Sequence, residues 1–128
     1  MMNKPEPGLR GRFSETVTPE KTARHYGSGS VEVFATPAMI AGMEKTCMDS
    51  VQPLLAAGET TVGTMIHATH VKATSLHDTI TYQSVLTGVN DRQLTFSVEA
   101  YDSKGLIGRA EHHRFIINTE RFMQKLAR

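Results

Sequence analysis

The chain has 128 residues, enough for one domain with a single hydrophobic core. Its formal net charge is +1, and basic and acidic residues are spread along the chain, so nucleic acid is not an expected partner. The single cysteine excludes an internal disulfide. Neither a signal-peptide core nor an apolar run of about 18–20 residues is present, so no membrane association is expected and the predicted location is the cytoplasm.

The beginning of the chain predicts little regular structure. Residues 1–12 are rich in proline and glycine and poor in apolar side chains, which is typical of a flexible leader or a loose edge segment. We predict a leader at residues 1–12 and the single domain at residues 13–128. Residues 27–30 read Gly-Ser-Gly-Ser and predict a loop without the lysine of a phosphate-binding loop. The next four residues, 31–34, predict a short strand.

Thr36 and Pro37 mark the start of a long helix. Thr36 is the predicted N-cap and Pro37 the first helical residue, where its missing N–H costs nothing. The helix is expected to run to about residue 57, with a kink or a new turn at Pro53 and an end at Gly58. Its apolar stripe is predicted to contain Ile40, Met43, Cys47, Val51, Leu54 and Leu55.

The remainder of the chain changes to a period of two, which is typical of strands. Strands are predicted at residues 60–72, 78–89, 93–101 and 106–117, and a short helix at about 119–127 closes the chain. The order is a strand, a long helix and an antiparallel meander, without βαβ alternation. The sequence therefore predicts an α+β fold in which one antiparallel sheet surrounds one long helix.

Two polar residues of the long helix stand out. Glu44 falls in the apolar stripe, where a carboxylate is costly to bury unless it is paired or protonated. Alternatively, Glu44 lies at the margin of the stripe and reaches water. Thr36 lies on the same side, about 12 Å nearer the N-terminus. It can act simply as a cap, or belong to a helix terminus whose amides stabilise a developing oxyanion.

His70 is the histidine expected to face this helix. Even spacing predicts that it shares its face with Val62, Thr64, Ile66 and Ala68. His67 would point to the other face with Gly63 and Met65. An imidazole facing the helix could exchange protons with a carboxylate, although a buried structural histidine is the common alternative.

Other chemistries are poorly supported. The pairs His67/His70 and His112/His113 each have an odd separation, which places the two rings on opposite faces of a strand, and no HExxH motif occurs. No metal site is therefore predicted. A GxSxG nucleophile is also absent, and Cys47 is expected to be inert core packing.

Three groups of residues carry a family resemblance. The first is Ala-Thr-Pro-Ala-Met-Ile at 35–40 followed by Met-Glu at 43–44. The second is Glu-Thr-Thr-Val-Gly-Thr at 59–64 with Thr-His-Val at 69–71, and the third is the glycine at 108 with His-His-Arg-Phe at 112–115. In this order and spacing they resemble hotdog-fold acyl-CoA thioesterases related to fluoroacetyl-CoA thioesterase, over roughly residues 13–126.

The resemblance implies a site and a reaction. The reactive threonine, glutamate and histidine of the family would fall on Thr36, Glu44 and His70. Gly63 would contact the thioester through its backbone, and Arg114 would support that glycine. The implied reaction is hydrolysis of a small acyl-CoA to the free acid and CoA, with no cofactor. The implied assembly is a homodimer with active sites at the interface, and two such dimers could pair into a tetramer.

The resemblance leaves the acyl group open. The fluoroacetate-specific enzyme carries a lid segment with a phenylalanine before its threonine, whereas here the loop 27–30 leads directly into residues 31–34. Phe34 is predicted to contact substrate, and the other candidates for lining the acyl pocket are Met39, Met43, Met65 and Tyr82. The residues do not choose between Glu44 as nucleophile, Thr36 as nucleophile, and Glu44 as general base.

Two other functions fit the same fold. The first is an acyl-CoA-binding or sensing protein without catalysis, in which the polar residues only order the pocket. The second is a hydratase, which would need a loop-borne aspartate and histidine a few residues apart. His77 and Asp78 are adjacent and do not have this spacing.

Overall fold

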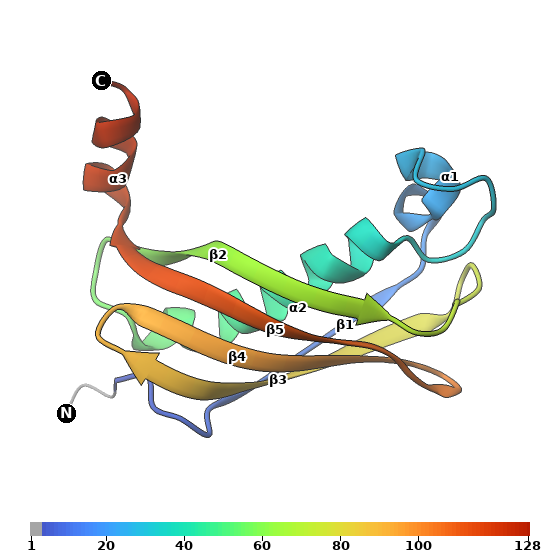
Figure 1. The fold of residues 1–128 in the computed structure, drawn as a ribbon, viewed down its shortest axis with the longest axis horizontal. Coiled ribbons are helices and arrows are strands. Elements are labelled where there is room, and N and C mark those ends of the chain that lie inside the picture. Colours follow the sequence, from blue (N-terminus) through green and yellow to red (C-terminus); the bar gives the residue numbers. More distant parts are fainter. Residues whose placement is uncertain (1–3) are drawn as a thin grey trace.

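A computed structural model describes residues 4–128, in which a five-stranded antiparallel sheet curves around one long helix (Figure 1). The strands are β1 (Arg10–Thr16), β2 (Glu59–His70), β3 (Thr79–Asn90), β4 (Gln93–Asp102) and β5 (Gly105–Asn118). The α-helices are α1 (Ala23–Tyr26), α2 (Thr36–Val51) and α3 (Thr119–Leu126), and two 3-10 turns are η1 (Pro19–Lys21) and η2 (Gln52–Leu54). The predicted α+β architecture is confirmed.

The strand order in the sheet is β1-β3-β4-β5-β2. The four strands β2 to β5 begin and end within two residues of the predicted bounds, because turn residues mark their ends. Asp91 has a φ of +56° between β3 and β4, and Gly105 has a φ of +133° at the start of β5. β2 pairs on one side with β5 and forms one edge of the sheet.

Two predictions for the N-terminal part were wrong. Residues 10–12, assigned to the leader, belong to β1, which pairs with β3 from Arg10↔Val85 to Thr16↔Thr79. β1 alternates between exposed and half-buried residues and has one large apolar side chain, Phe13, so its pattern is weak. Residues 31–34 do not form a strand, and only Val33 and Phe34 make isolated bridges, with Ser75 and Thr22. Residues 1–3 of the predicted leader lie outside the described part of the chain.

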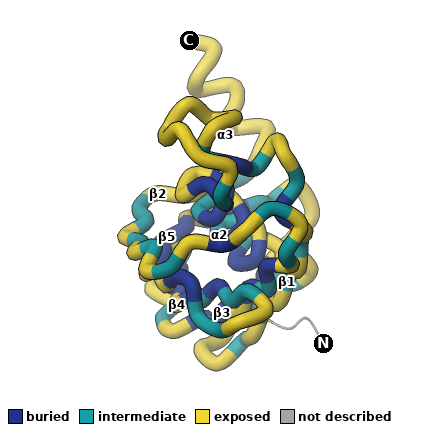
Figure 2. Tube along the Cα trace, turned by 90° about the vertical axis from the view of Figure 1, so that its right-hand side faces the viewer, coloured by how far each residue is buried: buried dark blue, intermediate teal, exposed yellow. Residues whose placement is uncertain are grey.

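α2 provides the inner layer of the core. Figure 2 shows it in the middle of the arc formed by the strands, with buried positions between helix and sheet. The helix ends at Val51 rather than near residue 57, Pro53 lies in the separate turn η2, and Gly58 turns the chain into β2 with a φ of +81°. The buried residues of α2 are Ala38, Met39, Gly42, Met43, Thr46, Cys47 and Val51, so the true stripe is centred beside the predicted one.

A β-bulge interrupts the pairing of β2 with β5. Gly63 pairs with Arg114 and Met65 with His113, so Thr64 is an extra residue with no partner opposite it. The bulge breaks the even spacing on which the sequence analysis relied. Gly63 was predicted on the face opposite His70. In the structure both residues lie on the side of β2 that faces α2.

The last helix, α3, projects away from the end of the sheet (Figure 1). None of its residues is buried, and Met123 and Leu126 are exposed. Within residues 4–128, no helix is both long and apolar enough to cross a membrane.

Candidate functional site

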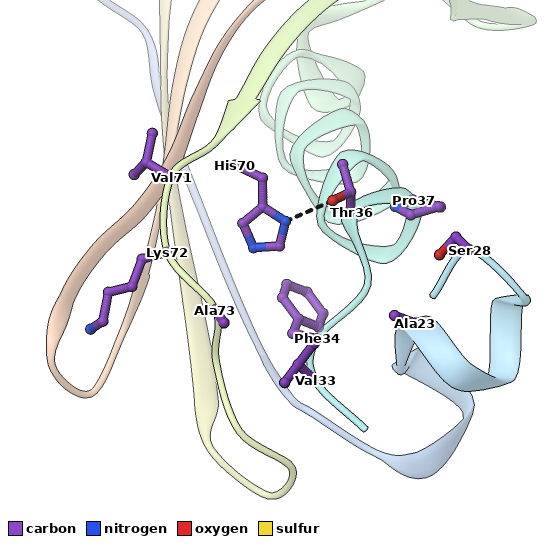
Figure 3. A pocket seen from close by; sticks show the side chains of 10 residues that line it. All are labelled: Ala23, Ser28, Val33, Phe34, Thr36, Pro37, His70, Val71, Lys72 and Ala73. Carbon is purple, nitrogen blue, oxygen red and sulfur yellow. Dashed lines mark hydrogen bonds between the residues drawn. The ribbon is translucent and has the colours of Figure 1, made fainter. Parts of the chain in front are cut away.

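Thr36 and His70 meet where α2 begins. The N-cap of α2 is Ala35, and no side chain caps the helix, so the predicted capping role of Thr36 was wrong. The Thr36 hydroxyl instead lies 2.8 Å from Nδ1 of His70, at the end of β2 (Figure 3). The partner of the Thr36 hydroxyl is therefore a residue 34 positions away in the sequence, and not the backbone at the start of α2 as predicted.

His70 has one ring nitrogen engaged and one without a partner. Its Nε2 is buried and makes no hydrogen bond with any residue in the described range. The Phe34 ring stands edge-on to the imidazole, with centroids 6.3 Å apart. Burial lowers the pKa of His70 below its ordinary value of 6.5, and the Lys72 backbone partly opposes this shift. At neutral pH the ring is therefore uncharged and able to accept a proton.

A pocket of about 460 Å³ opens beside this pair (Figure 3). Its lining residues are Ala23, Ser28, Val33, Phe34, Thr36, Pro37, His70, Val71, Lys72 and Ala73. Phe34 is among them, and its contact with substrate stays a prediction. The candidates Met39, Met43 and Tyr82 are fully buried in the core and do not line this pocket.

Glu44 lies two helical turns farther along α2 and is half-buried. A Cβ placed on Gly63 would lie 2.9 Å from Oε2 of Glu44, so the carboxylate points at the bulge of β2. Within residues 4–128, Glu44 makes no hydrogen bond or ion pair. Glu44 therefore lies at the margin of the buried face of α2, which was one of the two predicted alternatives. Its carboxylate faces the sheet.

Arg114 lies next to this carboxylate and is only 6% exposed. Its Nε donates to the Thr61 hydroxyl at 2.7 Å, and its Nη2 donates to the Thr61 carbonyl at 2.9 Å. Its Nη1 lies 3.1 Å from Nε2 of His112. A Cβ on Gly63 would lie 3.4 Å from the same Nη1, so Arg114 and Glu44 border the same point from two sides.

His112 is the residue of this site that the sequence reasoning missed. It was considered as half of a metal-binding pair with His113 and appeared in the group 112–115 that carries the family resemblance, but no role was assigned to it. It is 1% exposed, and its Nδ1 lies 2.8 Å from the carbonyl of Met65. The spacing of two from Arg114 was the available signal, because residues i and i+2 of a strand share a face.

Metal and thiol chemistry find no support in the described residues. No group of three or more His, Cys, Asp or Glu side chains between residues 4 and 128 is arranged to hold a metal ion. Cys47 is fully buried, and burial raises the pKa of its thiol to about 12, which fits the predicted packing role.

The site therefore has two halves. We name the Thr36–His70 pair the reactive half, and the group formed by Glu44, Gly63, His112 and Arg114 the bulge half. Thr36 and Glu44 are eight residues apart on α2, which is about 12 Å along a helix. No hydrogen bond joins Glu44 to Thr36 or His70 within the described chain. The single chain thus brings Thr36 to His70 and Glu44 to Gly63 and Arg114, but keeps the two groups apart.

Known proteins share this arrangement of elements. The family model described as "Fluoroacetyl-CoA-specific thioesterase" matches residues 17–120. The fluoroacetyl-CoA thioesterase of Streptantibioticus cattleyicolor is 38% identical over 125 residues, covering 93% of this chain and 90% of that protein.

Solved structures give the same result. A structure of the fluoroacetyl-CoA thioesterase FlK superposes with a TM-score of 0.91 at 35% identity, covering 98% of this chain and 97% of that one. A Thermus thermophilus protein described as a thioesterase superfamily member has a TM-score of 0.88 at 27% identity, covering 99% and 93%. The hotdog fold expected from the sequence is confirmed. The chain belongs to the fluoroacetyl-CoA-specific thioesterase family and is a thioester hydrolase.

Proposed function

We propose that the protein hydrolyses a small acyl-CoA to the free acid and CoA, with Thr36, Glu44 and His70 as its reacting groups. The observation that carries this proposal is the bond between the Thr36 hydroxyl and Nδ1 of an uncharged His70 at the wall of a pocket. A hydroxyl bonded to a neutral imidazole is the arrangement in which a base activates an oxygen nucleophile. The position at the start of α2 adds the positive end of the helix dipole.

Charge development on the thioester carbonyl is the step that the site must stabilise. Backbone amides at the start of α2 and at the bulge near Gly63 are the candidate donors for the oxyanion. Glu44 either attacks the carbonyl carbon, forming a transient anhydride, or removes a proton from the attacking water. In the first route the thiolate leaves as the anhydride forms, and water then hydrolyses the anhydride, with His70 taking the proton of this water and passing it to the CoA thiolate. In the second route the proton that Glu44 takes from water passes through His70 to the leaving thiolate. Thr36 either orients the carboxylate or attacks in its place.

The separation of the two halves supports a homodimeric enzyme. β2 is an edge strand with twelve residues available for pairing. If two copies of β2 pair antiparallel about an axis near Ile66 and His67, Gly63 of one protomer comes opposite His70 of the other. Antiparallel α2 helices crossing near Ile40 would place each Thr36 beside the other Glu44. A twofold axis generates both contacts twice and completes two sites.

The space at Gly63 points to a short acyl group. Glu44, His112 and Arg114 all lie within 3.4 Å of the place where a single Cβ would stand, so there is no room there for a long chain. The relative from Streptantibioticus cattleyicolor is named for fluoroacetyl-CoA, which makes two-carbon acyl groups the first substrates to test. The pocket beside Thr36 and His70 has Ser28 of the exposed loop 27–30 in its wall, and its volume of about 460 Å³ leaves space for other groups. A cytoplasmic location stays a prediction.

The decisive experiment measures CoA release from a panel of short, branched, aromatic and fluorinated acyl-CoAs, comparing the wild type with Glu44→Gln. We expect the variant to lose a factor of about 10³ or more in kcat, because an amide can neither attack nor accept the proton. Its melting temperature should stay within a few degrees of the wild-type value. Wild-type turnover in the variant would refute the role of Glu44. Tight binding of acyl-CoA without release by the wild type would favour a sensing protein.

A further inference from the structure

His112 is a buried polar residue to which the proposed reaction assigns no task. It lies in β5, and its ring packs at a tilt against Phe96 with centroids 6.4 Å apart. Its two nitrogens are both engaged, Nδ1 with the Met65 carbonyl and Nε2 with Nη1 of Arg114. Met65 is the first residue after the bulge, so this one ring connects the bulge to the arginine.

The two partners of His112 fix its protonation state. A carbonyl oxygen can only accept a hydrogen bond, so Nδ1 must carry a proton. A guanidinium can only donate, so Nε2 must be free of one. His112 is therefore neutral in the functional structure and exists as the Nδ1–H tautomer.

We propose that His112 is a positioning residue that holds the bulge half of the site in its active geometry. The neutral ring accepts one hydrogen bond from Arg114 and donates one to the backbone after the bulge. This keeps the guanidinium beside Gly63, opposite the Glu44 carboxylate. The inference rests on the proposed function, because its consequence for catalysis passes through Glu44.

Protonation of His112 would reverse one of these bonds. A proton on Nε2 would place two donors and two positive charges 3.1 Å apart, and the Arg114 side chain would have to leave Nε2. Besides Arg114, the titratable groups near His112 are Glu44 and Cys47 on α2 and His113 on β5. The neighbours on β2 and β4, Thr61 and Phe96, have no titratable side chain. Burial, which is the largest cause, lowers the pKa of His112, as do Arg114 and His113, whereas the Glu44 carboxyl raises it.

Two substitutions separate the roles of the ring nitrogens. His112→Gln can place an oxygen near the Nε2 position and still accept from Arg114, but loses the bond to Met65. His112→Asn can donate from near the Nδ1 position to Met65, but leaves Arg114 without its acceptor. His113→Gln is the matched control, because the neighbouring ring bonds Glu111 instead and takes no part in this group.

The first readout is the pH profile of kcat/KM. His112→Asn should lower kcat/KM about 10- to 100-fold at pH 7.5, since the charged donor loses its buried partner, whereas His112→Gln should stay within about threefold. The acid limb of the His112→Gln profile should also be shallower than that of the wild type and of His113→Gln. Equal losses in both His112 variants, or an unchanged acid limb in His112→Gln, would overturn the proposal.

The second readout does not depend on turnover. Long-range nitrogen–proton NMR spectra of histidine-labelled protein distinguish the two neutral tautomers of imidazole, and the signal missing in His112→Gln identifies this ring. We expect the Nδ1–H tautomer at pH 7.5. Finding the Nε2–H tautomer or a charged ring would refute the proposal, even if the protein is an active thioesterase. Finding the expected tautomer in a protein without turnover would instead refute the proposed function.

Discussion

Apart from Glu44, which makes no hydrogen bond within residues 4–128, the two halves of the site differ in how completely their polar atoms are bonded. In the reactive half, Thr36 and His70 share one hydrogen bond, and Nε2 of His70 has no partner in residues 4–128. In the bulge half, Arg114 makes three hydrogen bonds, and both nitrogens of His112 are engaged. The reactive half borders an open pocket, whereas the core of the bulge half is buried.

This difference agrees with the proposed division into reacting groups and supporting groups. A group that must give and take a proton needs a free position and moderate exposure, as His70 has. A group that fixes the direction of a charge works best when several of its donors are held, as in Arg114, where each of the three nitrogens makes one hydrogen bond. We therefore expect changes in the reactive half to reduce activity with little effect on stability, and changes in the bulge half to act through the position of Glu44.

The largest effect is expected in the reactive half. Thr36→Val removes the hydroxyl and keeps the shape, so kcat should fall about 10²- to 10⁴-fold. The free energy of unfolding should change by less than about 0.5 kcal/mol, because Thr36 is exposed and does not cap α2. Turnover and urea unfolding measure the two quantities. Thr87→Val on β3 is the control, and its activity should equal that of the wild type. A large loss of stability in Thr36→Val would contradict the expected difference between the two halves of the site.

A smaller effect is expected from Gly63→Ala. The added Cβ would lie 2.9 Å from Glu44 Oε2, which is the free end of a flexible side chain and can move away. We therefore expect a loss of about 10- to 100-fold in kcat/KM with little change in melting temperature.

Gly88→Ala is the matched control, since Gly88 also lies at an irregularity of pairing and the new Cβ would be 3.7 Å from its nearest neighbour, an ordinary contact. Equal activity in the two alanine variants would show that the space at Gly63 is not used.

The smallest effect is the pH dependence of stability. The pKa values of His70 and His112 are both lowered, chiefly by burial, so the unfolded chain binds these two protons more readily than the folded chain. Below about pH 6.5 stability should therefore decrease as the pH falls. Urea midpoints at pH 7.5, 6.5 and 5.5, at fixed protein concentration, measure this. The decrease should be smaller in His112→Gln, and a constant midpoint across this range would contradict the neutral state of both rings.

Most of the fold could be predicted because its signals are local. The turns at Asp91 and Gly105 limit the strands of the meander to within two residues. β1 was largely missed because its one strong feature is Phe13, in a segment that otherwise looks like a polar leader. The helix end was misplaced because Gly58 serves the turn into β2 rather than the end of α2.

The site was harder to derive from local patterns. Strand alternation placed Gly63 and His70 on opposite faces, and only the pairing with β5 reveals the extra residue between them. The Thr36 hydroxyl was assigned to its own helix because its real partner comes from a distant strand. The family resemblance identified Gly63 and Arg114, but His112 became visible only when its two partners could be seen together.

The bulge of β2 also determines what the deletion of a single residue would do to the sheet. Every residue of β2 other than Thr64 already faces its partner on β5, so a chain that lacked Thr64 would keep the same pairs in an uninterrupted ladder. Such a deletion would give a more regular sheet while removing the distortion on which the bulge half depends. The loss of this single residue would therefore exchange the placement of Gly63 beside Glu44 and Arg114 for an uninterrupted ladder.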